Sequence, residues 1–272
     1  MTLRSDTGRI PFIFTHIPKT GGTSVRARIH AAAVEAGIET DHIHVPGYGG
    51  IPHNQNTDVM SSTDMNKLKQ RRLLCLADHG VYGVHERLSM HGAAYFTLLR
   101  NPIWTAVSYY YQTMSRLILE ADQKHLEYYR ARLSESDFGA LLAWRTVPNI
   151  NRCPRAILLA VVGDKEQSVL FYLGLPYAQS SVAEACRCLR DEYCGFGLLE
   201  HMAESLQILR AVGPPWLNGI NTIPHHLNRG DYPREPLVSG VETLLRETAA
   251  YDLEIYAWAM ANFDAIYRAS QR

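Results

Sequence analysis

A segment near the start of the chain has the composition of an anion-binding loop. Residues 16–24 read H-I-P-K-T-G-G-T-S, after an apolar run and before a helical pattern. Adjacent glycines let a backbone bend tightly and approach a bound group, and the first N–H groups and dipole of a following helix favour phosphate or sulfate. The candidate binding residues, which add a positive charge and three hydroxyls to these groups, are Lys19, Thr20, Gly21, Gly22, Thr23 and Ser24. We interpret the segment as a phosphate cradle rather than an ordinary strand-to-helix turn with a solvated lysine.

The order of residues in this loop differs from that of a Walker A loop. In G-x-x-x-x-G-K-[ST] the lysine follows the glycines, whereas Lys19 precedes Gly21 and Gly22. We also find no apolar strand that ends in a clear Walker B aspartate. Because both features depart from the P-loop pattern, a nucleotide kinase or NTPase that uses the same cradle is the alternative interpretation and not the leading one.

A second strand-to-helix junction is predicted at Arg100. Residues 93–99 (A-A-Y-F-T-L-L) are apolar, as expected for a buried strand, and Arg100 follows them. Asn101 suits the N-cap of a helix and Pro102 suits its first position. The sequence therefore predicts a long helix over 102–120.

Apolar runs and helical patterns alternate along the whole chain. We expect strands at 9–17, 72–77, 93–99 and 195–199, and helices from 23 and over 102–120, 137–144, 154–162, 181–193, 203–212 and 238–268. This alternation indicates an α/β fold, with a P-loop-like parallel sheet flanked by helices and a helix-rich C-terminal half. Ligands bind such sheets at the carboxyl ends of the strands, so the 16–24 loop, His79 and Arg100 should meet at one edge. The Pro-, Gly- and polar-rich segments 42–65 and 213–236 are expected to be mobile loops at its rim.

Length and composition restrict the class of protein. The 272 residues are expected to form a single domain, 1–272, and the 27 basic and 27 acidic residues give a net charge of +0, unlike a protein that binds nucleic acid along its length. No run approaches the roughly 18 apolar residues of a membrane span, and the N-terminus has no signal-peptide core. Five cysteines suggest neither a disulfide framework nor a common zinc spacing. We therefore expect a cytoplasmic protein without a membrane span or a metal.

The loop resembles a known cofactor-binding motif. P-K-T-G-G-T-S after a first strand resembles the 5′-phosphosulfate loop of sulfotransferases that use 3′-phosphoadenosine 5′-phosphosulfate (PAPS). The chain is most similar to the carbohydrate-sulfotransferase-like branch, which includes heparan sulfate 2-O-sulfotransferases and bacterial sulfotransferase family 2 proteins. In that family an arginine at a strand end and a serine eight positions later hold the 3′-phosphate, and Arg100 and Ser108 match this spacing.

Weaker similarities follow in the family's order. A-D-H-G-V-Y-G-V-H-E resembles its Gly-His stretch, with Asp78 in place of the usual glycine, and N-R-C-P-R-A-I-L aligns Arg155 with a cofactor-binding arginine. G-F-G-L-L-E-H-M and the tail Y-D-L-E-I-Y resemble its last motifs. The resemblance therefore extends from about residue 10 to residue 263.

The resemblance implies transfer of a sulfuryl group from PAPS to a hydroxyl acceptor, with an amine as the second choice. Lys19 would neutralise charge on the leaving phosphate, and a histidine would take the acceptor's proton. His79 and His85 are both candidates for this base, and the resemblance favours His79. Glu200 could orient a catalytic group or could serve as a helix-cap partner.

Two questions stay open at this level. The departure at Asp78 allows a binding module that retains the pocket for PAPS, or for its product 3′-phosphoadenosine 5′-phosphate (PAP), without catalysis. The acceptor, a small molecule or a carbohydrate, and the oligomeric state are not specified by the sequence.

Overall fold

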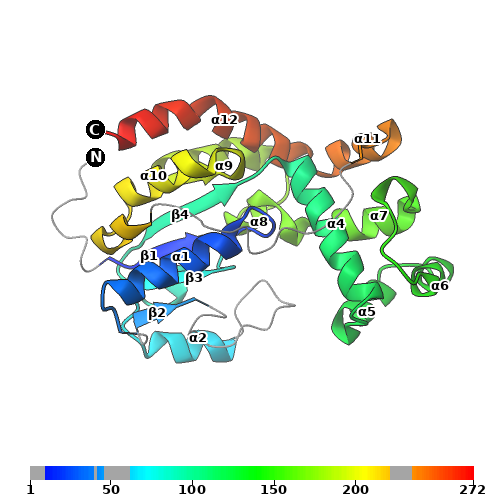
Figure 1. Ribbon diagram of the computed structural model, residues 1–272, viewed down its shortest axis with the longest axis horizontal. Helices are drawn as coiled ribbons and strands as arrows, with labels where there is room; N and C mark the ends of the chain where they lie inside the picture. Colours follow the sequence, from blue (N-terminus) through cyan, green and yellow to red (C-terminus); the bar gives the residue numbers. More distant parts are fainter. Residues whose placement is uncertain (1–9, 40–41, 46–61, 221–234) are drawn as a thin grey trace.

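A five-stranded, wholly parallel sheet forms the centre of the protein (Figure 1). The computed structural model describes residues 10–39, 42–45, 62–220 and 235–272. The strands, in the spatial order β2-β3-β1-β4-β5, are β1 (Phe12–Thr15), β2 (Ile43–His44), β3 (Cys75–Asp78), β4 (Ala94–Leu99) and β5 (Tyr193–Leu198). The expected α/β class with a parallel sheet is confirmed.

The strands are apolar because both faces of the sheet are covered. Phe12, Ile13 and Phe14 of β1 have no exposed surface, and such continuous apolar runs are typical of parallel strands. The covering helices are α1 (Gly22–Glu35), α2 (Ser62–Lys69), α3 (Val84–Arg87), α8 (Val169–Tyr172), α9 (Ser180–Asp191), α10 (Met202–Val212) and α12 (Ala250–Ser270). In Figure 1, α1 lies beside β1 and β3. The helices α9, α10 and α12 all contact β5.

A helical part projects from the carboxyl end of β4 and has a buried core of its own. It is built from α4 (Pro102–Ile118), α5 (Gln123–Arg130), α6 (Glu135–Ala143), α7 (Arg155–Val162) and α11 (Ser239–Thr248). Figure 1 shows α4 running from the sheet toward α5. The predicted start of α4 is confirmed, since Asn101 is its N-cap and accepts hydrogen bonds from Ile103 N (3.0 Å) and Trp104 N (3.5 Å).

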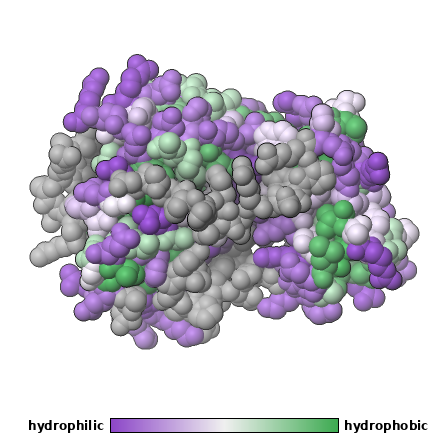
Figure 2. Space-filling model, in the orientation of Figure 1, coloured by the Kyte–Doolittle hydropathy of each residue, from purple (hydrophilic) through white to green (hydrophobic). Residues whose placement is uncertain are grey.

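Short 3-10 helices complete the described structure. They are η2 (Ile150–Arg152), η3 (Lys165–Gln167), η4 (Leu199–His201) and η5 (Pro215–Gly219). On the face seen in Figure 2, polar residues cover most of the described surface and apolar residues lie in small areas. None of the helices in the described ranges is both long and apolar enough to cross a membrane.

Several segments differ from the sequence-based expectation, including the helices α3, α5 and α8, which were not expected. The segment 42–65 contains the two-residue strand β2 and the start of α2, and 213–236 contains η5, whereas both were expected to be irregular. The expected helix 238–268 is divided at Ala249 into α11 and α12. The expected rim largely falls on residues 46–61 and 221–234, which lie outside the described residues.

Candidate functional site

The loop between β1 and α1 has a strained backbone that suits close contact with a ligand. Lys19 and Gly21 both have positive φ, 63° and 87°, a conformation that is unfavourable for lysine and tends to persist at functional sites. A side chain on Gly21 would come within 2.7 Å of Leu199 Cδ1, so this position also needs glycine for space. The carbonyl oxygen of Lys19 accepts a hydrogen bond of 3.0 Å from Arg100 Nη1, which joins the two predicted anion-binding residues.

The start of α1 lacks the side-chain groups that would compete with an anion. Its N-cap is Gly21, which offers no side-chain acceptor, and its first turn contains no acidic residue. The buried Thr20 hydroxyl donates a hydrogen bond to the carbonyl of Ile17 (2.8 Å). In this structure the hydroxyl hydrogen of Thr20 is therefore used within the loop itself. The positive end of the α1 dipole therefore faces the loop without a compensating carboxylate in that turn.

Lys19 lies in a strongly cationic environment. Burial, then the charges of Arg100 and Arg116, lower the pKa of its amine to about 8. Among the described residues, no carboxylate forms an ion pair with Lys19 or Arg100. A bound anion would compensate this positive charge and raise the pKa of Lys19 again.

The end of β4 is fixed by groups from η4 and α12. Glu200 accepts a hydrogen bond of 2.9 Å from the backbone N–H of Asn101, directly after Arg100. The Tyr256 hydroxyl is hydrogen-bonded to Glu200, and burial is the main cause that raises the pKa of Tyr256. Glu200 therefore stabilises the junction between β4 and α4 by accepting the Asn101 N–H. Ser108 is buried on α4, about two turns beyond the N-cap.

His79 directly follows β3 and lies beside the loop. Its backbone N–H donates to Asp78 Oδ1 (2.8 Å), and the fully buried Asp78 is also paired with His44 Nε2 (3.2 Å) and Arg26 Nη1 (3.6 Å). The residue that departs from the family pattern thus connects β3, β2 and α1. Sequence reasoning found no strand that ends in a clear Walker B aspartate, and the structure places Asp78 at the end of β3, beside β1.

The ring of His79 stacks on that of His16, a residue that sequence reasoning did not select. Their centroids are 4.2 Å apart and their planes differ by 25°. A Cβ on Gly22 would lie 1.9 Å from His16 Cδ2, so the second loop glycine provides the space for this ring. The only sequence signal for His16 was a histidine placed between an apolar strand and the cradle.

His85 lies toward the other end of the sheet. Its Nδ1 is 2.9 Å from the hydroxyl of Tyr95, the second residue of β4. Arg100 follows the last residue of that strand, and β-strands rise about 3.3 Å per residue. The structure therefore separates His85 from the loop and brings His79 to it.

Arg155, a predicted cofactor contact, also lies apart from the loop. It begins α7, its side chain is 70% exposed, and its nearest ionic partner is Glu247 of α11 at 3.8 Å. It does not line the pocket described below. No contact of the described structure links it to Lys19 or Arg100.

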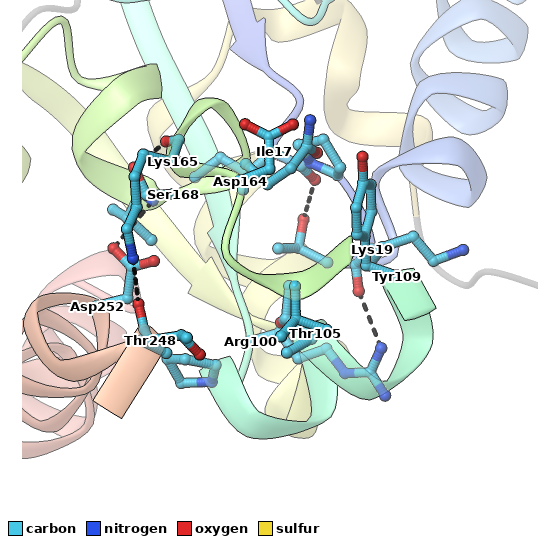
Figure 3. Close-up of a pocket in the computed structure, with 18 of the residues that line it drawn as sticks. Ile17, Lys19, Arg100, Thr105, Tyr109, Asp164, Lys165, Ser168, Thr248 and Asp252 are labelled. Carbon is cyan, nitrogen blue, oxygen red and sulfur yellow. Dashed lines mark hydrogen bonds between the residues drawn. The ribbon is translucent and has the colours of Figure 1, made fainter. Parts of the chain in front are cut away.

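A pocket opens between the loop, α4 and α8 (Figure 3). Ile17–Thr20 form one wall, and Thr105, Ala106 and Tyr109 of α4 form a second. The opposite wall is a polar cluster missed by sequence reasoning, made of Asp164, Lys165, Ser168, Tyr177, Thr248 and Asp252.

The polar cluster is held by its own hydrogen bonds. Lys165 Nζ and the Tyr177 hydroxyl both donate to the Thr248 carbonyl, at 2.7 and 2.6 Å. Asp252 accepts from Val169 N (3.1 Å), and burial raises the pKa of its carboxyl to about 7 while burial also lowers the pKa of Lys165. These residues stabilise the junction of η3, α8 and α12 and leave the centre of the pocket open.

Comparison with protein-family models and with curated proteins gives no match for this chain. The family resemblance therefore depends on the motifs themselves and on the site that they form.

Proposed function

We propose that the protein is a PAPS-dependent sulfotransferase, with a hydroxyl-bearing small molecule or carbohydrate as acceptor and an amine as second choice. The observation that carries the proposal is the junction of Lys19 and Arg100. Arg100 donates to the Lys19 carbonyl, and the half-buried lysine has its pKa lowered to about 8 in the absence of a described carboxylate partner. Two cations held in this way at the start of a helix support a ligand with two separate anionic groups.

The residues divide between the two ends of the cofactor. Lys19 and the backbone N–H groups of 21–24 would hold the 5′-phosphosulfate, and Arg100 and Ser108 would hold the 3′-phosphate. Arg155 remains a proposed cofactor contact on the resemblance alone, because its exposed position beside Glu247 does not support it.

The transfer follows from these positions. The acceptor oxygen forms a bond to sulfur while the bond between sulfur and the bridging oxygen breaks, and PAP leaves with the electron pair. Lys19 stabilises the charge that develops on the leaving phosphate, and His79 takes the proton of the acceptor hydroxyl. Positive charge at the site comes from this chain's lysine, arginines and helix dipole.

One observation favours the second candidate, a nucleotide kinase or NTPase. Asp78 ends the strand next to β1, at register with Thr15, which is where a magnesium-binding aspartate would be sought. However, its carboxylate already contacts Arg26, His44 and the His79 N–H. Because these three donors already contact the buried carboxylate, a structural role for Asp78 fits better than a role as a metal ligand.

The test combines binding with transfer. Calorimetric titration with PAP, followed by a screen of hydroxyl and amine acceptors with sulfur-labelled PAPS, should give PAP binding and a labelled product. Absence of PAP binding at high micromolar concentration would contradict the proposal. ATP turnover that requires magnesium would support the kinase alternative, and PAP binding without transfer to any acceptor would support an inactive binding module.

A further inference from the structure

We propose that His16 is a positioning residue, which places the ring of His79 relative to the cofactor loop. This inference rests on the proposed function, because it assigns His16 to the same site. The geometry that carries it is the stack of the His16 ring on the His79 ring, together with the close approach of the His16 ring to Gly22.

The sheet register creates this arrangement. Thr15 of β1 is paired with Asp78 of β3, and the His16 N–H continues the ladder with a 2.9 Å hydrogen bond to the Asp78 carbonyl. The next residues, His16 and His79, are therefore neighbours on adjacent parallel strands. Side chains at such positions point to the same face of a sheet, and here the rings stack at 4.2 Å.

The ring of His16 is buried close to Gly22 at the start of α1. A single carbon added to Gly22 would approach three atoms of the His16 ring within 2.8 Å, and His16 is only 4% exposed. The ring of His79 also faces the Tyr172 ring, with centroids 6.3 Å apart. His79 is only half-buried, so we infer that the more deeply buried His16 ring sets the position of the His79 ring.

The main chain of His79 is held separately. Asp78 binds its backbone N–H, and Arg26 and His44 bind Asp78 in turn. These contacts fix the main chain of His79, and the stack on His16 bears on the orientation of its ring. His16 thus supplies a second constraint, and Gly22 links it to the loop that would hold the 5′-phosphosulfate.

A double-mutant cycle tests this role. We compare His16→Ala, His79→Ala and the double variant in kcat, acceptor KM and PAP affinity, with His85→Ala as the matched control. If His16 acts through His79, His16→Ala lowers kcat about 10- to 100-fold with little change in PAP affinity, and the double variant is no slower than His79→Ala alone. Multiplicative losses, or a wild-type kcat for His16→Ala, would overturn the proposal.

A measurement without turnover separates this inference from the proposed function. Carbethoxylation of His79 by diethylpyrocarbonate, followed by mass spectrometry, should be several-fold faster in His16→Ala than in the wild type, with His85 as the internal reference. PAP should slow this modification in the wild type more than in the variant. An unchanged rate at His79 would refute the positioning role even if no acceptor were ever sulfated, whereas a faster rate without PAP binding would leave the positioning role standing and contradict the proposed cofactor.

Discussion

The guanidinium of Arg100 donates a 3.0 Å hydrogen bond to the main-chain carbonyl of Lys19, across 81 positions of sequence. The bond joins the end of β4 to the loop after β1, which are neighbours in the sheet. It also keeps a second cation close enough to lower the pKa of Lys19. The same contact therefore fixes the conformation of the loop and brings a second positive charge to it, which favours the binding of an anion.

Affinity for PAP should fall as the pH rises through about 8. The pKa of Lys19 is lowered to about 8, so the amine loses its charge above that pH. Because a bound anion favours the protonated amine, PAP binding near pH 8 should take up about half a proton. Calorimetry in buffers of different ionisation enthalpy measures this uptake, and Lys19→Met should abolish it. An uptake that persists in Lys19→Met would assign the titration to another group.

The same lysine should affect stability in the ligand-free protein. Its folded pKa is lower than that of an unfolded lysine, so between about pH 8 and 10.5 the unfolded chain binds more protons. The free energy of unfolding should therefore rise with pH across this window through Lys19. Urea unfolding of the wild type and Lys19→Met at several pH values measures the difference, which should shrink as the pH rises.

Arg100→Ala and Ser108→Ala should weaken binding of PAP more than binding of adenosine 5′-phosphosulfate, which lacks the 3′-phosphate. A charge-assisted contact is worth about 1.5–3 kcal/mol, so Arg100→Ala should cost roughly 10- to 100-fold in PAP affinity. Arg155→Ala is the matched comparison, because its side chain is exposed and paired with Glu247. Equal losses for both ligands would show that Arg100 and Ser108 do not recognise the 3′-phosphate.

Sequence patterns predicted the structure best at positions where the residue type suits a single local conformation. Asn101 and Pro102 predicted the start of α4 because only a helix N-terminus uses that pair well. By contrast, β2 has two residues and no periodicity of its own, and it exists because β3 offers a partner. The stack of His16 on His79 depends on the register of β1 and β3, which a single sequence does not encode locally.

Gly22→Ala should lower both stability and transfer rate. The new methyl group would overlap the His16 ring, whose Cδ2 lies 1.9 Å from the ideal Cβ position. Such overpacking typically costs about 1–3 kcal/mol, and the displaced ring would move His79. Gly139→Ala in α6 is the control, because nothing lies within 4 Å of its Cβ position. Thermal unfolding should show a lower Tm for Gly22→Ala and an unchanged or higher Tm for Gly139→Ala.

Asp78→Ala should destabilise the protein strongly. The buried carboxylate compensates the charge of Arg26, contacts His44 Nε2 and accepts a hydrogen bond from the His79 N–H. Removal of one partner from such a network typically costs about 3–5 kcal/mol, because the remaining charge stays buried. Asp78→Asn keeps the volume and one acceptor, so urea unfolding should place it between the wild type and Asp78→Ala. Equal stability of Asp78→Asn and the wild type would show that charge contributes nothing there.

His79→Ala should bind PAP normally and transfer sulfate poorly. His79 follows β3 at the edge of the sheet where Lys19 and Arg100 lie, and it stacks on His16 beside Gly22. Removal of a general base typically costs 10²–10⁴-fold in rate and leaves cofactor affinity almost unchanged. Single-turnover transfer from labelled PAPS measures the rate, and calorimetry measures the affinity. Lys19→Ala should instead lose both.

His85→Ala is the control for this assignment, because its ring contacts Tyr95 near the amino end of β4. Its rate should stay within a few-fold of the wild type. If His85→Ala were inactive and His79→Ala active, the assignment of the base would be wrong. If neither substitution mattered, the acceptor would have to lose its proton to another group. Glu200 would be tested next, although its bond to Asn101 N–H and its contact with Tyr256 already engage its carboxylate.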